Sequence, residues 1–202
     1  MLRIIAGRHR GRKLAPIAGD ALRPTGGRAR EAIFNILAHA AFAPRPAYAD
    51  AVVLDAFAGS GALGLEALSR GARFVTFMER DRAVRAVLSA NVAALGAERQ
   101  TAVIAGDALS PPRAHAPASL AFLDPPYADD IAAQALAALA AAGWLQPEAI
   151  AVVELPARRD FAPPSGFVPI DERRYGAAKI VFLRYSAATA SAAGGSAGAA
   201  RS

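Results

Sequence analysis

The tetrapeptide Asp124-Pro125-Pro126-Tyr127 combines a carboxylate, two prolines and an aromatic ring directly after the apolar residues 119–123. Proline fixes its own φ and pushes the preceding residue into extended conformations, so this sequence predicts a rigid turn at the end of a strand. Such a turn can present the Asp124 carboxylate and the Pro125 carbonyl as acceptors, with Tyr127 as a stacking face. We therefore predict that these four residues form a catalytic site for a planar amino group of a purine, a pyrimidine or an amide. A proline-rich surface loop is the alternative interpretation of the tetrapeptide.

A glycine turn with the pattern G-x-G-x-x-G, at Gly59, Gly61 and Gly64, lies between a short apolar run and a helical pattern. In that context the glycines let the backbone approach a ligand bound above the carboxyl ends of parallel strands. Asp55 precedes the turn, and it would repel the pyrophosphate of a dinucleotide by on the order of a few kcal/mol. S-adenosylmethionine carries an ammonium and a sulfonium group and no phosphate. The acid therefore favours S-adenosylmethionine over NAD as the cofactor.

Two further acids follow the next two predicted strands. Glu79 lies 20 residues after Gly59, where a carboxylate can accept both hydroxyls of a ribose. Asp107 can accept from an adenine amino group while the N–H of Ala108 reaches a ring nitrogen. A loop acid or a helix cap is the alternative for each acid alone, but acids after three successive strands favour one shared site. The predicted cofactor contacts are Asp55, Phe57, Gly59, Gly61, Glu79, Asp107, Ala108 and Thr25.

The elements that position these residues alternate between strand and helix patterns. Strands are predicted over 52–54, 74–78, 101–104, 120–123 and 150–155, and helices over 62–70, 81–95 and 131–142. This alternation predicts an α/β fold with a mostly parallel sheet. Two more strands, 167–170 and 180–185, follow each other without a helix, so they are predicted to form an antiparallel pair at the sheet edge.

The basic residues of the chain are concentrated at its N-terminal end. Residues 1–30 carry eight basic side chains and one acidic side chain, so the net charge of +6 leaves the other 172 residues at −1. Such a cluster is typical of phosphate-backbone binding, whereas a genome rich in G and C would raise the arginine content without clustering it. The predicted nucleic-acid contacts are Arg8, Arg10, Arg12, Lys13, Arg23, Arg28 and Arg30.

The 202 residues suffice for one domain with an appendage. We predict a basic N-terminal hairpin and helix over 1–45, a catalytic domain over 46–186, and a disordered tail rich in Ala, Gly and Ser over 187–202. The chain has no cysteine and three scattered histidines, so no metal site is expected. No apolar run suits a signal peptide or a membrane span, and we expect a cytoplasmic monomer.

Four sequence segments together resemble the RsmD family of bacterial 16S rRNA methyltransferases. They are RIIAGRHRGRKL (3–14), RPTGGRAREAIFNIL (23–37), DAFAGSGALGLEALSRGA (55–72) and DPPY (124–127). The resemblance implies a Rossmann-like class I methyltransferase fold with a mostly parallel seven-stranded sheet, an antiparallel edge strand and an N-terminal hairpin and helix extension. It also implies S-adenosylmethionine as methyl donor and N2 of a guanine in 16S rRNA, or in a small-subunit assembly intermediate, as acceptor.

Other activities remain open on the motifs alone. DPPY is shared with DNA adenine and protein glutamine methyltransferases, and the basic N-terminal residues disfavour a protein substrate. A nicotinamide-dependent oxidoreductase would use the same glycine turn. An assembly factor that only holds rRNA would use the basic residues but would leave Asp55, Glu79, Asp107 and DPPY without a role.

Overall fold

The computed structural model describes residues 2–17, 26–43, 46–126 and 130–187. Three predicted site residues, Arg23, Thr25 and Tyr127, lie outside the described residues, as does the predicted disordered tail apart from Ala187. No helix within the described ranges is long and apolar enough to cross a membrane.

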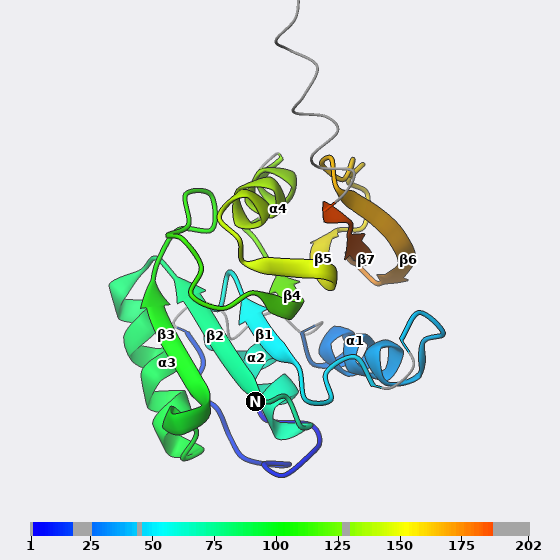
Figure 1. Cartoon of the computed structure of the whole chain (residues 1–202). Coiled ribbons are helices and arrows are strands. Elements are labelled where there is room, and N and C mark those ends of the chain that lie inside the picture. Colours follow the sequence, from blue (N-terminus) through cyan, green and yellow to red (C-terminus); the bar gives the residue numbers. More distant parts are fainter. Residues whose placement is uncertain (1, 18–25, 44–45, 127–129, 188–202) are drawn as a thin grey trace, which may run out of the picture.

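One seven-stranded sheet forms the centre of the molecule, in the order β3-β2-β1-β4-β5-β7-β6 (Figure 1). Its strands are β1 (Val52–Asp55), β2 (Phe74–Glu79), β3 (Thr101–Ala105), β4 (Ala118–Leu123), β5 (Leu145–Pro156), β6 (Phe167–Tyr175) and β7 (Ala178–Tyr185). β1 to β5 are mutually parallel. The predicted strands and the predicted mostly parallel sheet are thus confirmed.

The last two strands form the predicted antiparallel pair at the edge of the sheet. β7 is antiparallel to both of its neighbours, β5 and β6, so β6 runs in the same direction as the parallel strands. The strand that reverses direction therefore lies one place inside the edge. Gly176, with φ 60°, lies in the short connection that lets the chain turn back from β6 into β7.

Helices cover both faces of the sheet. The helices are α1 (Gly26–His39), α2 (Ala62–Ser69), α3 (Arg82–Ala94) and α4 (Ile131–Ala141), with a short 3-10 turn η2 (Glu98–Gln100) before β3. α1, α2 and α3 pack on one face, where Phe34, Leu65 and Leu88 meet strand residues such as Val53. α4 packs on the other face together with Leu54, the neighbour of Val53. Side chains that alternate along each strand thus fill two separate cores.

Asp81 confirms the predicted start of α3. Its Oδ1 accepts from the N–H groups of Ala83 at 2.7 Å and Val84 at 3.0 Å. These backbone hydrogen bonds lower the pKa of the Asp81 carboxyl. The cap therefore satisfies two of the free N–H groups at the helix start.

The N-terminal residues 2–17 fold back on themselves, and we call them the N-terminal segment. Arg3 and Lys13 form an isolated antiparallel bridge, and Leu14 donates its N–H to the Leu2 carbonyl at 3.0 Å. Ile4 and Leu14 are buried in the same core as α1, α2 and α3. The expectation of an appendage is therefore wrong for this segment, because its apolar side chains complete the core of the main body.

Candidate active site

The carboxyl ends of β1 and β4 meet where the strand order reverses, the usual ligand crevice of an open α/β sheet. Asp55, the last residue of β1, is in register with Phe122 of β4, and Asp124 follows two residues later. The N–H of Ala56 donates to the Phe122 carbonyl at 2.9 Å, so the start of the glycine turn is fixed to the end of β4. The structure thus brings the two predicted motifs together at one edge of the sheet.

Three acidic residues, Asp55, Glu79 and Asp124, interact electrostatically at this edge. The pKa of Asp55 is raised to about 8, mainly by burial and also by the nearby carboxylates of Asp124 and Glu79, while the hydrogen bond from Gly64 opposes the shift. A site in which carboxylates disfavour each other's ionisation favours a bound cation. This charge pattern suits the sulfonium and ammonium of S-adenosylmethionine and opposes a pyrophosphate.

Asp55 accepts a hydrogen bond from Gly64, the third glycine of the G-x-G-x-x-G turn. Its side chain is buried, and its Oδ2 accepts from the Gly64 N–H at 2.9 Å. A Cβ built on Gly64 would lie 2.4 Å from Cε1 of Phe77, so only glycine permits this approach of α2 to β2. The structure therefore gives Asp55 a positioning role in addition to the charge for which it was predicted.

Glu79 connects the glycine turn to the loop after β2. Its Oε2 accepts from the Gly59 N–H at 3.1 Å, and its Oε1 accepts from the Asp81 N–H at 2.9 Å. Gly59, with φ 53°, and Gly61, with φ 82°, have left-handed conformations that other residues rarely adopt. Each carboxylate oxygen keeps a second acceptor position, so Glu79 can still accept from a ribose.

Asp107 and Ala108 follow β3 on the same edge. The Gly106 N–H donates to the Glu79 carbonyl at 3.4 Å, which holds this loop beside Glu79. Asp107 is half-buried; its Oδ1 accepts from the Leu109 N–H at 2.9 Å and its Oδ2 lies 3.6 Å from the Arg80 Nη1. Ala108 is buried. The predicted adenine contacts are thus on the β3 side of the crevice.

The other predicted residues of the crevice are placed as follows. Phe57 is partly buried against the α4 core. Asp124 is half-buried, Pro125 is buried and Pro126 is exposed. The part of the tetrapeptide that the structure describes thus passes from the core to the surface directly after β4. Among the described residues, no group of three or more Asp, Glu, His or Cys is arranged to hold a metal.

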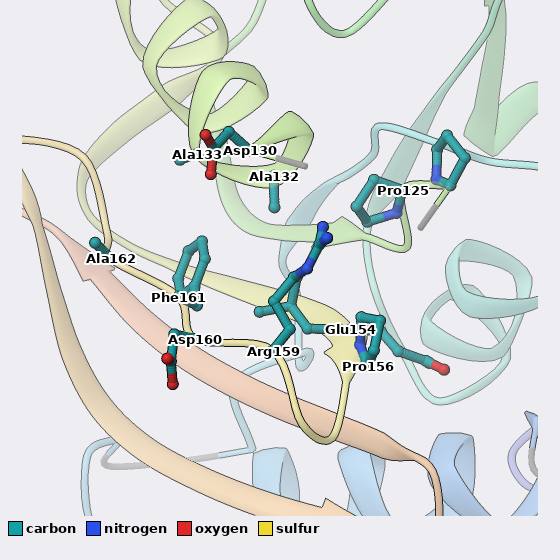
Figure 2. A pocket seen from close by; sticks show the side chains of 12 residues that line it. Pro125, Asp130, Ala132, Ala133, Glu154, Pro156, Arg159, Asp160, Phe161 and Ala162 are labelled. Atoms are coloured by element: carbon teal, nitrogen blue, oxygen red, sulfur yellow. The ribbon is translucent and has the colours of Figure 1, made fainter. Parts of the chain in front are cut away.

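A second cavity, lined in part by Pro125, contains residues that the sequence analysis did not single out. It is lined by Pro125 and Pro126 after β4, by the start of α4, by the end of β5 and by the connection from β5 to β6, and its polar lining includes Glu154, Arg159 and Asp160 (Figure 2). Glu154 follows Val153, which is in register with Leu123, so Glu154 lies beside Asp124 across the sheet. An acid near the end of a predicted strand was the signal that identified Asp55 and Glu79, and it applied equally to Glu154.

The basic turn of the N-terminal segment, residues 8–13, is distant from this crevice. Arg8 donates to the Gln100 Oε1 at 2.6 Å and Arg12 donates to the Ala94 carbonyl, so both lie where α3 ends and β3 begins. Figure 1 shows the turn, in dark blue, at the opposite end of the sheet from the tips of β1, β2 and β3. Arg10, Lys13 and Arg28 are exposed. The basic turn therefore does not lie at the entry to the crevice.

Arg30 differs from the other predicted nucleic-acid contacts because it is only 6% exposed. Its Nη2 donates to the Arg3 carbonyl at 2.7 Å, and its Nε lies 3.9 Å from the Glu66 carboxylate. Burial lowers the pKa of the Arg30 guanidinium, an effect that Glu66 opposes. The prediction that Arg30 binds phosphate is corrected, because its guanidinium holds the N-terminal segment inside the fold.

The chain is similar to known proteins over most of its length. A family model described as "Conserved hypothetical protein 95" matches residues 2–184. Ribosomal RNA small subunit methyltransferase D of Haemophilus influenzae is 37% identical over 179 residues, covering 87% of this chain and 89% of that protein. The protein of the same name from Escherichia coli K12 is 42% identical over 153 residues, covering 76% of this chain and 74% of that protein. The solved structure of yhhF from Escherichia coli matches with a TM-score of 0.77 and 37% identity, covering 92% of this chain and 98% of that chain. The chain therefore belongs to this family, the RsmD family of methyltransferases.

Proposed function

We propose that this protein transfers a methyl group from S-adenosylmethionine to the exocyclic N2 of a guanine in 16S rRNA. The observation that carries the proposal is the meeting of Asp55, Glu79 and Asp124 at the switch point, next to Pro125. The relatives named ribosomal RNA small subunit methyltransferase D support rRNA as the substrate. The proposal covers a guanine presented in free rRNA and one presented in a partly assembled small subunit.

The cofactor would lie over the glycine turn on the β1, β2 and β3 side of the crevice. Glu79 would accept from the ribose, while Asp107 and Ala108 would meet the adenine. When bound, S-adenosylmethionine supplies an electrophilic methyl group. Thr25 would complete this set, although it lies outside the described residues.

The acceptor amine would be held by Asp124 and the Pro125 carbonyl. Guanine N2 is a poor nucleophile because its lone pair is delocalised into the ring. Acceptors for its two protons favour a pyramidal nitrogen, and the Asp124 carboxylate stabilises positive charge that develops there. The nitrogen gains a methyl group and loses one proton, for which Asp124 is the nearest acceptor. Catalysis then consists mainly of alignment, with Pro126 fixing the turn and Tyr127 stacking on the base.

The target base must leave its helix or lie in an accessible loop before it can reach this site. The exposed residues Arg8, Arg10, Arg12, Lys13 and Arg28 would bind phosphates, together with Arg23. Because the basic turn lies at the far end of the sheet, the phosphates that it binds belong to rRNA well away from the target base.

The decisive experiment replaces Asp124 and follows both transfer and binding. We expect Asp124→Ala to lower kcat by about 100-fold or more, as for the loss of one transition-state hydrogen bond. Small subunits from a strain that lacks the gene would be the substrate, with transfer measured from tritiated cofactor and the product mapped by mass. Calorimetry with S-adenosylhomocysteine would establish that the variant retains its cofactor site. Undiminished transfer would remove Asp124 from the mechanism.

The same calorimetry separates methyl transfer from an oxidoreductase that uses the glycine turn. We expect the titration with S-adenosylhomocysteine to show heat of binding and the titration with NADH to show none. Binding of NADH alone would contradict the proposed function.

A further inference from the structure

Arg85 lies in the first turn of α3, and its side chain reaches back to the loop between β2 and α3. Its Nη1 donates to the Glu79 carbonyl at 2.9 Å and to the Arg80 carbonyl at 2.6 Å. Both carbonyls belong to the short connection that carries the chain from the end of β2 to the start of α3. One guanidinium group thus fixes two consecutive carbonyls beside the predicted ribose contact.

The peptide group between Arg80 and Asp81 connects Arg85 to the carboxylate of Glu79. The carbonyl of this peptide group accepts from the Arg85 Nη1, and its N–H donates to the Glu79 Oε1 at 2.9 Å. A hydrogen bond from a cation polarises the peptide group that accepts it, so the N–H of the same group becomes a stronger donor. Arg85 therefore orients and strengthens the hydrogen bond that holds Oε1.

The second carboxylate oxygen of Glu79 is held from the other side of the crevice. Its Oε2 accepts from the N–H of Gly59 in the glycine turn at 3.1 Å. With both oxygens held by backbone N–H groups, the plane of the carboxylate is fixed, and the remaining acceptor position of each oxygen has a defined direction. The two hydroxyls of a ribose lie on neighbouring carbons, so they need two acceptors in one fixed orientation.

Stabilisation of α3 is the alternative role for Arg85, and the helix itself argues against it. Asp81 already caps α3 with hydrogen bonds to Ala83 and Val84. The N-terminal end of a helix carries the positive end of the helix dipole, so a cation in the first turn is unfavourable there. Neither the cap nor the dipole thus accounts for an arginine at this position, whereas its hydrogen bonds converge on the backbone around Glu79.

We infer that Arg85 is a positioning residue for the cofactor ribose, and that it acts on Glu79 through the Arg80–Asp81 peptide group. This inference rests on the proposed function, which places the ribose of S-adenosylmethionine at Glu79. Arg85 acts at the ribose and not at the methyl group. Its loss should therefore weaken cofactor binding, raise the KM for S-adenosylmethionine and leave kcat near the wild-type value.

The test compares S-adenosylhomocysteine with its 2′,3′-dideoxy analogue, which lacks both ribose hydroxyls. Calorimetry on the wild-type protein should show that the analogue binds about 100-fold more weakly, since each hydrogen bond to a carboxylate is worth about tenfold in affinity. Arg85→Met keeps an unbranched apolar side chain without the donors, and it should reduce this ratio to about tenfold or less. Its affinity for the analogue should stay within about threefold of the wild-type value, which also shows that the variant is folded.

A double-mutant cycle tests whether Arg85 acts through Glu79. In a Glu79→Ala background, Arg85→Met should change the affinity for S-adenosylhomocysteine by less than about twofold. Arg85→Lys keeps a cation that can donate to the same carbonyls, so its ratio should lie between those of Arg85→Met and the wild-type protein. Arg82→Met is the matched control, because Arg82 is an exposed arginine in the same turn of α3; it should keep the wild-type ratio.

A wild-type ratio in Arg85→Met would overturn the inference. An equal loss of affinity for both ligands would also overturn it, because that result indicates a general structural role. Either result leaves the proposed function intact, since the wild-type protein still binds the cofactor product. A wild-type protein that does not bind S-adenosylhomocysteine would overturn the proposed function and this inference with it.

Discussion

Asn91 of α3 binds Ala15 of the N-terminal segment through both backbone polar groups of that residue. Its Oδ1 accepts from the Ala15 N–H at 2.7 Å, and its Nδ2 donates to the carbonyls of Ala15 at 3.0 Å and Ser60 at 2.9 Å. Asn91 is buried. Ser60 lies within the glycine turn, so one buried amide connects the N-terminal segment to the predicted cofactor site.

Replacement of Asn91 is therefore expected to affect both stability and cofactor affinity. Asn91→Ala leaves the Ala15 and Ser60 backbone groups without this partner, which should lower the free energy of unfolding by about 1–3 kcal/mol. The glycine turn loses a support, so the Kd for S-adenosylhomocysteine should rise. Urea denaturation and calorimetry measure the two effects. Asn35→Ala, an exposed asparagine on α1, is the control; equal cofactor affinity in the two variants would exclude this role for Asn91.

Glu66 should be the charged residue whose loss destabilises the protein most. It is fully buried and accepts from the N–H groups of Ile5 at 2.7 Å and Ala6 at 3.0 Å, and from the Arg70 Nε at 2.7 Å. Glu66→Ala leaves buried cations without their partner, which typically costs about 3–5 kcal/mol. We expect a loss of this size in urea denaturation. The exposed Glu98→Ala should change stability little, and a similarly small loss for Glu66→Ala would contradict the prediction.

Asp55 should make the unliganded protein less stable as the pH rises. Its folded pKa of about 8 exceeds the ordinary value of 3.8, so between these values the folded state binds more protons than the unfolded state. The contribution of Asp55 to stability therefore falls with rising pH, by up to about 1.4 kcal/mol per pH unit within this window. Asp55→Asn should flatten the dependence of the free energy of unfolding on pH between 5 and 8. A variant with the wild-type slope would show that Asp55 does not titrate in this range.

Cofactor binding should release a proton from the same carboxyl group. A cation near Asp55 favours its ionised form and so lowers its pKa below about 8. The affinity for S-adenosylmethionine should consequently increase between pH 6 and 8. Calorimetry at pH 7 in phosphate and in Tris should give binding enthalpies that differ in proportion to the difference between the ionisation heats of the two buffers. Equal enthalpies in the two buffers would mean that no proton is released.

The basic turn is expected to affect rRNA affinity without affecting the chemical step. Replacing Arg8 and Arg10 with glutamine should reduce the slope of log K against log salt by about 1.4–1.8, if each contacts one phosphate. The turn lies at the opposite end of the sheet from the crevice, so kcat should stay at the wild-type value. Arg173 and Arg174 of β6, with side chains 55% and 69% exposed, provide a matched double replacement. A loss of kcat in the Arg8 and Arg10 variant would place the turn close to the reacting base.

The periodic parts of the fold were accessible from the sequence because each strand and helix carries its own pattern. The ends of β1, β2 and β3 were identified by Asp55, Glu79 and Asp107, since an acid at a strand end is a local signal. Arg30 was misjudged because its burial depends on Glu66, 36 residues later in the chain. The contacts that hold the N-terminal segment in the fold are also made with residues far along the chain; Ile5 and its partner Glu66 are 61 residues apart.

The pocket beside Pro125 was missed for a related reason. Arg159 can be assigned to this pocket only in the folded structure, where Lys179 binds its carbonyl and Pro125 lines the same pocket. No spacing in the sequence links these three residues. In contrast, Asp124 and Pro125 were found because they are adjacent and their chemistry is local.

The position of β7 inside the sheet has a consequence for biosynthesis. β5 and β6 cannot occupy their final places until β7, which follows both in the chain, has been inserted between them. Until residue 185 has emerged from the ribosome, β5 presents an unpaired edge that can pair with other strands. Lys179 also arrives with β7, so the loop that carries Arg159 gains its anchor only then. A nascent chain therefore completes the pocket beside Pro125 as one of the last events of its synthesis.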